Sequence, residues 1–104
     1  MRRHNSAEIQ TLDEYRARYA LYKTDPALQA AHAVAPWIVT WDDHEFANNY
    51  AGDIPAKPVA RDDFLRRRAA AYQAYFEVMP LRRTALPVGP DMTLYRRLGF
   101  GRLA

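Results

Sequence analysis

Four consecutive ionisable residues, DDHE at positions 42–45, are the part of this sequence best suited to chemistry. Carboxylate oxygens and imidazole nitrogens are the ligands that many divalent and trivalent metal ions take in proteins. The cluster directly follows the apolar run WIVTW, which begins after Pro36 and favours a short buried strand over a helix. A strand that ends in this cluster would deliver it to the edge of a sheet, where ligands bind in open α/β folds.

The same cluster has a simpler interpretation as a solvated turn. Aspartate is one of the preferred residues at the start of a helix, because its carboxylate accepts hydrogen bonds from the free N–H groups of the first turn. No metal motif of fixed spacing, such as HExxH, is present to decide the matter. The residues alone therefore leave a metal site and a capping turn as alternatives.

Two helices are expected upstream of the cluster. Thr11 and Glu14 fit a capping box, which predicts a helix over residues 11–24. The Asp-Pro pair at 25–26 predicts a second helix over residues 26–35, because Asp caps well and Pro suits the first helical position. The first helix carries a stripe of one leucine and three tyrosines that we expect in the core: Leu12, Tyr15, Tyr19 and Tyr22.

The longest helix is expected over residues 61–79, where apolar residues recur at helical spacing and Pro80 ends the run. The arginines at 66–68 are interpreted mainly as a solvated or salt-bridged face. Besides the strand over 37–42, alternating apolar residues predict a strand over 92–98. This second strand has no partner nearby in the sequence, which indicates an incomplete sheet.

Length and composition narrow the function. A chain of 104 residues forms one domain at most, and 49% hydrophobic with 26% charged residues indicates a globular protein. The net charge of +3 leans only weakly toward anionic partners and does not predict specific nucleic-acid binding. No apolar stretch approaches the roughly 20 residues of a membrane span, and the N-terminus has no secretory signal. The absence of cysteine excludes disulfides and thiolate metal sites.

The string WDDHEFANNYAGD at positions 41–53 resembles the PhoD-like alkaline phosphatases, a branch of the metallophosphoesterases. The resemblance continues upstream in TLDEYRARYALYKTDPALQ and downstream in FLRRRAAAYQAYFEVMPLRR and DMTLYRRLGFG. It implies an α/β fold, in which residues 1–104 are a helix-rich, central part of a four-layer α/β sandwich. The family's upstream GDxxY-type motif and its C-terminal histidine motifs do not occur in these residues.

The resemblance also implies roles for individual residues, because WDDHE stands where many metallophosphoesterases carry GNHE or GNHD. Asp43 then takes the place of an asparagine that binds a metal and a phosphate oxygen. His44 takes the place of a histidine that stabilises or protonates the leaving group. Asp42 is a further candidate metal ligand, and Glu45 a candidate acceptor that orients His44. Asn49 is a candidate contact to the substrate phosphate, or else stabilises its own turn.

The activity implied is hydrolysis of phosphate monoesters and diesters with calcium and iron, in which bound metal ions activate water and neutralise the phosphate. The family's enzymes are typically exported to the periplasm or beyond, whereas this chain shows no export signal, so its location is not predicted. One motif supplies one or two ligands where a catalytic metal usually takes at least three. We therefore expect the remainder of a phosphatase domain as a structural partner and no turnover by this chain alone.

The competing hypotheses belong to other classes. One is a non-catalytic helical interaction or nucleic-acid-binding module, whose binding to duplex DNA would depend steeply on salt. The acidic edge argues against it, because carboxylates repel phosphates unless a cation lies between them. The other is an incomplete gene product without a function of its own.

Overall fold

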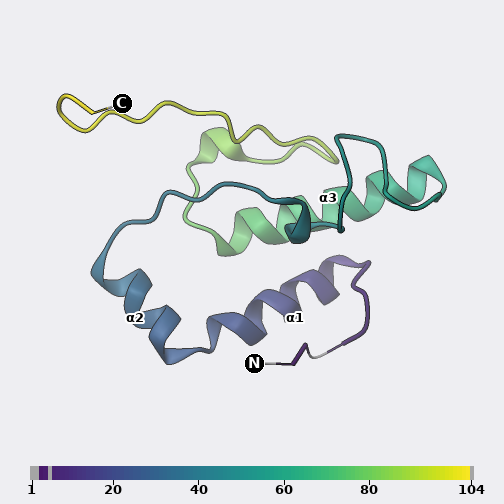
Figure 1. Ribbon diagram of the computed structural model, residues 1–104, viewed down its shortest axis with the longest axis horizontal. Coiled ribbons are helices and arrows are strands. Elements are labelled where there is room, and N and C mark those ends of the chain that lie inside the picture. The colour runs from purple at the N-terminus through teal and green to yellow at the C-terminus, as the bar shows by residue number, and fades with distance from the viewer. Residues whose placement is uncertain (1–2, 5, 104) are drawn as a thin grey trace.

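A computed structural model describes residues 3–4 and 6–103 (Figure 1). Over this part of the chain the predictions of helices at 11–24, 26–35 and 61–79 are confirmed to within one residue at each end. Two short 3-10 turns add to these helices. In chain order the elements are α1 (Leu12–Lys23), α2 (Pro26–Val34), η1 (Asp43–Glu45), α3 (Arg61–Val78) and η2 (Arg83–Ala85).

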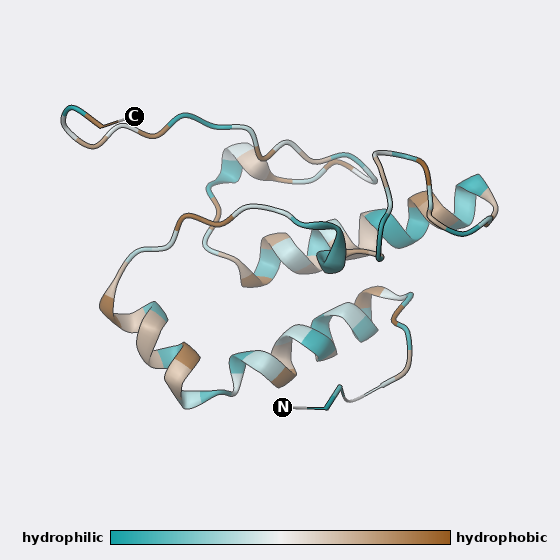
Figure 2. Ribbon diagram, in the orientation of Figure 1, coloured by the Kyte–Doolittle hydropathy of each residue, from teal (hydrophilic) through white to brown (hydrophobic). Residues whose placement is uncertain are grey.

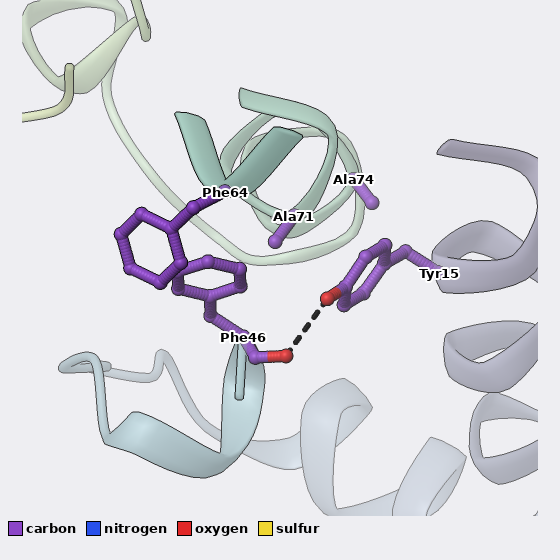
Figure 3. Close-up of a cluster of buried hydrophobic side chains, with 5 residues drawn as sticks. All are labelled: Tyr15, Phe46, Phe64, Ala71 and Ala74. Carbon is purple, nitrogen blue, oxygen red and sulfur yellow. Dashed lines mark hydrogen bonds between the residues drawn. The ribbon is translucent and has the colours of Figure 1, made fainter. Parts of the chain in front are cut away.

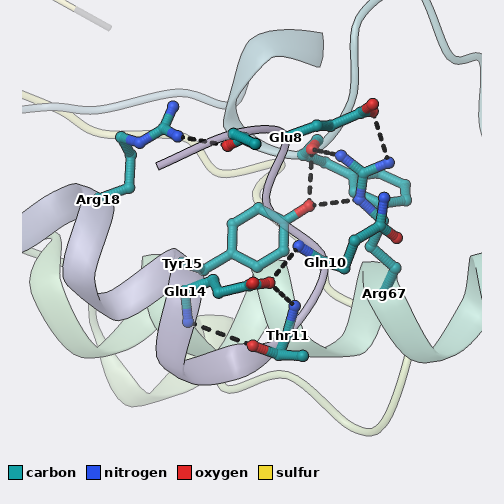
Figure 4. A network of polar contacts seen from close by, with 9 residues as sticks. Glu8, Gln10, Thr11, Glu14, Tyr15, Arg18 and Arg67 are labelled. Atoms are coloured by element: carbon teal, nitrogen blue, oxygen red, sulfur yellow. Dashed lines mark hydrogen bonds and ion pairs between the residues drawn. The ribbon is translucent and has the colours of Figure 1, made fainter. Parts of the chain in front are cut away.

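The predicted caps start α1 and α2. The Glu14 carboxylate accepts a hydrogen bond from the Thr11 N–H at 2.9 Å, and the Thr11 hydroxyl accepts one from the Glu14 N–H at 3.3 Å (Figure 4). The Asp25 carboxylate accepts from the N–H groups of Ala27 at 2.9 Å and Leu28 at 3.1 Å. These bonds satisfy backbone donors that a helix start otherwise leaves free, which explains why the sequence located both helices well.

Helices α1 and α3 lie side by side and run in the same direction (Figure 1). Between them sits the core, in which Tyr15 reaches from α1 toward the two smallest side chains of the α3 face (Figure 3). Alanines at these α3 positions allow the close approach. The buried cluster consists of Tyr15, Phe46, Phe64, Ala71 and Ala74, each no more than 4% exposed.

The face that α3 buries is not the most regular apolar repeat of its sequence. The repeat Leu65–Ala69–Tyr72–Phe76–Met79 remains only partly buried. Fully buried positions on α3 are Phe64, Ala71, Ala74 and Tyr75. The helix is apolar on more than one side. It packs against α1 on one side and against the segment before η1 on another.

The two predicted strands are wrong for the described residues. Residues 37–42 and 92–98 form no strand there, and the backbone pairs only in isolated bridges such as Ala51 with Ile54. The run from 37 is also not buried, since Ile38 is 64% exposed. A strand exists only when a second strand supplies its hydrogen bonds, and no described segment lies in position to do so. The α/β class is therefore not observed, and the described part is helical.

Apolar side chains remain on the surface beyond the helices. Figure 2 shows brown segments along the chain between α2 and η1 and along the C-terminal segment that leaves the helices. The exposed large side chains of the described residues include Ile38, Val88, Tyr95, Phe100 and Leu103. None of the helices in the described ranges is long and apolar enough to cross a membrane.

An ion pair fastens the far end of α3 to α1. Arg16 donates from Nε and Nη2 to the two carboxylate oxygens of Glu77, each at 2.8 Å. The hydrogen bonds from Arg16 lower the pKa of Glu77 from its ordinary 4.5 to about 2. A carboxylate with a lowered folded-state pKa stabilises the fold above pH 4.5 and loses that contribution as the pH falls toward 2.

Glu77→Gln is therefore expected to lower the melting temperature at pH 5–7, with a difference from the parent that vanishes toward pH 2. The effect is small, because both partners are more than a third exposed and water screens their attraction. Melting curves followed by circular dichroism across this pH range test it. Asp13→Asn is the matched control, since Asp13 is 93% exposed and contacts Arg16 only at 3.3 Å. A difference that persists at pH 2 would contradict the assignment.

Candidate metal centre

The DDHE cluster folds as a single tight turn. Residues Asp43–Glu45 form η1, and the Asp43 carbonyl accepts hydrogen bonds from the N–H groups of Phe46 at 3.0 Å and Ala47 at 2.9 Å. The Glu45 carboxylate reaches back to the Asp42 N–H at 2.8 Å, as in a capping box. The capped-turn interpretation of the sequence thus describes the backbone here, and the cluster does not end a strand.

The turn brings three potential ligands together. His44 Nδ1 lies 2.9 Å from the Asp42 carboxylate and 3.2 Å from the Asp43 carboxylate. One ligand atom from each of the three residues lies within 4.8 Å of the others. Calcium–oxygen distances are about 2.3–2.6 Å, so ligands on opposite sides of one ion stand roughly 5 Å apart. The spacing of Asp42, Asp43 and His44 therefore fits a single cation.

The two carboxylates and the imidazole also influence each other's charge. Hydrogen bonding to Asp42, followed by the charge of Asp43, raises the pKa of His44. The hydrogen bond from His44 in turn lowers the pKa of Asp42. The side chains of His44 and Asp42 are 67% and 69% exposed, whereas that of Asp43 is 23% exposed. Asp43 is thus the most enclosed group of the cluster, and the other two face solvent.

Asn49 and Glu45 lie at the same turn, where each makes a hydrogen bond that orders it. Asn49 has a left-handed backbone, with φ of 58°, and its backbone N–H donates to the Asp43 carboxylate. This bond leaves the Asn49 side-chain amide unused and fixes Asp43 instead. The groups that contact the His44 ring are Asp42 and Asp43, while Glu45 bonds backbone. Glu45 therefore orders the turn, and its role toward His44 stays a prediction.

Helix α3 fastens the backbone on both sides of the turn. Before it, the Tyr75 hydroxyl donates to the Thr40 carbonyl at 2.8 Å. After it, Arg68 Nη1 donates to the Gly52 carbonyl at 2.6 Å. These contacts hold the ends of the segment 40–52 on one rigid helix, although neither residue was singled out from the sequence for this role.

A third contact joins α1, α3 and the residue next to the turn. The Phe46 carbonyl accepts from the Tyr15 hydroxyl at 2.7 Å (Figure 3). It also accepts from Arg67 Nη2 at 3.3 Å. Arg67 Nε also donates to the Tyr15 hydroxyl at 2.8 Å, and its Nη1 pairs with Glu8 at 3.2 Å (Figure 4). One guanidinium therefore ties the N-terminal segment, the core tyrosine and the site turn together.

The interpretation of arginines 66–68 as a solvated or salt-bridged face is confirmed in part, since each of the three pairs with a carboxylate but only Arg66 is largely exposed. The Arg66 side chain is 77% exposed and pairs with Asp63 on its own helix. Arg67 and Arg68 are 15% and 11% exposed. Successive helical residues point about 100° apart, so a run of three cannot all face solvent on a packed helix. That geometry was the available signal for an inward arginine.

Comparison with known proteins agrees with this geometry. The family model of the PhoD-like phosphatases matches residues 1–104. The chain belongs to the PhoD-like phosphatase family. It is 61% identical over all 104 residues to alkaline phosphatase D of Bacillus subtilis (strain 168) and spans 18% of that protein's length. A solved structure of PhoD superposes with a TM-score of 0.92 at 61% identity, over 96% of this chain and 19% of that one.

The resemblance drawn from WDDHE is thereby confirmed. The TM-score of 0.92 means that the helices of this PhoD-like chain are arranged as in the corresponding part of the solved PhoD chain. Family membership also favours a phosphatase over the interaction-module alternative. The chain spans about a fifth of the length of the relatives it matches. The activity of a whole PhoD-like protein is therefore a separate proposal for this chain.

Proposed function

We propose that this chain forms the central part of a metal-dependent phosphate ester hydrolase, acting on phosphate monoesters and diesters. The observation that carries the proposal is the meeting of Asp42, Asp43 and His44 on one turn, with ligand atoms within 4.8 Å, in a chain of the PhoD-like family. We assign Asp43 and Asp42 to the metal, and His44 to the leaving group of the ester.

The positions of the side chains support this division of roles. Asp43 is the more enclosed carboxylate and is fixed by the Asn49 N–H, which suits a metal ligand that must keep its place. His44 has its Nδ1 held by carboxylates, so its exposed Nε2 can present a proton to a leaving oxygen. The Asn49 side-chain amide, free of the backbone bond to Asp43, is assigned to a phosphate oxygen.

Calcium and iron are the metals we propose. Carboxylate oxygens suit calcium, and a set that mixes carboxylate with imidazole suits iron. When bound, such ions would offset the charge of the phosphate and lower the pKa of a water molecule. The chain's own residues hold the ion, orient the ester and deliver the proton.

We further propose that the remainder of a phosphatase domain completes the site and the sheet. The extended segments 38–40 and 94–103 border a groove of about 660 Å³. Its lining includes Ile38 and Phe100, which are 64% and 61% exposed. Strands from the remaining four-layer α/β sandwich would pair with these segments and bury their apolar side chains. They would also bring the further ligands that a catalytic metal needs.

Calcium binding tests the metal assignment. We expect this chain to bind calcium with a dissociation constant on the order of 1 mM, the range of sites with few charged ligands. Asp43→Asn is expected to weaken binding roughly tenfold, because it removes the best-ordered carboxylate. Isothermal titration calorimetry measures both. Asp53→Asn is the matched control, since Asp53 pairs with Arg61 outside the cluster. Equal affinities for Asp43→Asn and the parent would remove Asp43 from the metal site.

The dependence on the remainder of the domain is tested by activity. With 4-nitrophenyl phosphate, calcium and iron, we expect no turnover by the 104-residue chain, because Asp42 and Asp43 supply fewer than the three protein ligands that a catalytic metal usually takes. Release of 4-nitrophenolate is followed by absorbance. Turnover that disappears in His44→Ala would show that this chain needs no further ligands, and would overturn that expectation while supporting the role of His44.

A further inference from the structure

An aromatic recess opens beside the acidic turn. A cleft of about 500 Å³ is lined by Asp42, Asp43 and Asn49 together with three aromatic side chains. We call these aromatic side chains, Trp41, Tyr50 and Tyr72, the aromatic wall. None of the three is fully buried. Partly exposed aromatic rings thus line the same cleft as the groups assigned to metal and phosphate.

The aromatic wall is held rigidly. The Trp41 ring meets the ring of Tyr72 edge-to-face at 4.6 Å between centroids, and that of Tyr75 at 4.8 Å. Trp41 Nε1 donates to the Tyr50 hydroxyl at 2.5 Å. Tyr50 packs in turn on the core residue Phe46 at 4.6 Å. A surface ordered in advance loses little conformational entropy when a ligand binds to it.

The charge around the recess is divided in a way that suits one kind of ligand. The two aspartates repel an anion unless a cation is bound to them. The Arg68 guanidinium, which pairs with Asp91, lies 5.8 Å from the Tyr72 ring centroid and places a positive charge next to one ring of the wall. A ligand with a phosphate at one end and a flat apolar group at the other matches this arrangement, provided that the cation is present.

We propose that the aromatic wall binds the organic group of the phosphate ester and makes the site prefer esters that carry a planar aromatic substituent. This inference rests on the proposed function, since it places the phosphate at the cation held by Asp42 and Asp43. Trp41, Tyr50 and Tyr72 then determine specificity and take no part in bond breaking. Stacking of aromatic groups predicts a preference for aryl over alkyl esters of roughly threefold to tenfold in affinity.

The fluorescence of Trp41 tests the proposal. In a Trp37→Phe background Trp41 is the one remaining tryptophan of the sequence. Titrations with calcium and then with inorganic phosphate, methyl phosphate or phenyl phosphate give three dissociation constants. We expect phenyl phosphate to bind roughly threefold to tenfold more tightly than methyl phosphate. Tyr72→Ala should abolish that ratio and leave the affinity for methyl phosphate unchanged. Tyr95→Ala is the control, because Tyr95 is 98% exposed and is not among the residues that line the recess.

The possible outcomes separate the two proposals. Equal affinity for phenyl and methyl phosphate, with calcium-dependent binding of both, overturns the aromatic wall and leaves the proposed function standing. No calcium-dependent binding of inorganic phosphate overturns the proposed function and this inference with it. Binding of phenyl phosphate with the same affinity in the presence and in the absence of calcium also overturns the inference. Tyr72→Leu keeps the side-chain volume closer to that of tyrosine, so loss of the ratio in this variant, with an unchanged circular dichroism spectrum, supports stacking even if Tyr72→Ala unfolds.

Discussion

Replacement of Phe46 by alanine is expected to lower the free energy of unfolding by about 3–5 kcal/mol, the cost typical of a buried phenylalanine. Phe46 is 2% exposed and its ring packs on Phe64 at 5.0 Å and on Tyr50 at 4.6 Å. It directly follows the site turn, so the cavity left behind loosens the turn as well as the core. Globular domains are stable by only about 5–15 kcal/mol, so a loss of this size removes a large share of the stability.

Urea denaturation followed by circular dichroism measures the loss. Phe100→Ala is the matched control, because it makes the same substitution at a phenylalanine that is 61% exposed. Its effect is expected to stay within about 0.5 kcal/mol. Similar losses for the two variants would mean that the cluster around Phe46 is not the core that holds the turn.

The helices were predictable because their signals are local. A cap such as Thr11 with Glu14 bonds groups three residues apart, so it forms wherever that short sequence occurs. Asp25 and Pro26 act over a similar range. The buried face of α3 was less predictable, because alanines and aromatics recur on several sides of this helix. The position of α1 decides that Ala71 and Ala74 are the buried ones.

The strands failed for the opposite reason. An apolar run such as 37–41 indicates a segment able to join a sheet, while its strand hydrogen bonds depend on a partner distant in the sequence. Within the described residues that partner is missing, and Ile38 lies largely in solvent. The sequence pattern therefore indicates only that the segment is able to form a strand. Whether it forms one depends on a pairing segment distant in the sequence.

The candidate site divides in the same way. Asp42, Asp43 and His44 were predictable as a group, because neighbours on one turn necessarily lie close together. The residues that fix the turn were not, since Arg67 and Arg68 acquire their role from carbonyls more than ten positions away. Composition assigns arginine to the surface. In this chain, hydrogen bonds to the carbonyls of Phe46 and Gly52 hold Arg67 and Arg68 against the rest of the protein.

Arg67→Met is expected to lower the free energy of unfolding by about 2–3 kcal/mol, the range for hydrogen bonds that involve a charged group. The substitution keeps an apolar stem in place and removes the donors to the Tyr15 hydroxyl and the Phe46 carbonyl. Arg66→Met is the matched control, since Arg66 is 77% exposed and bonds only its own helix. Its effect is expected to stay within about 0.5 kcal/mol. Urea denaturation compares the two.

Two further measurements separate a positioning role of Arg67 from a purely electrostatic one. A double-mutant cycle with Tyr15→Phe should give a coupling of roughly 0.5–3 kcal/mol, because the two side chains share one network. Calcium affinity of folded Arg67→Met should fall, since the turn that carries Asp43 loses a support. Removal of a positive charge acts in the other direction, because it favours cation binding. A rise in calcium affinity, with no coupling to Tyr15, would mean that Arg67 acts only through its charge. The turn would then be held by Tyr15, Arg68 and Tyr75 without Arg67.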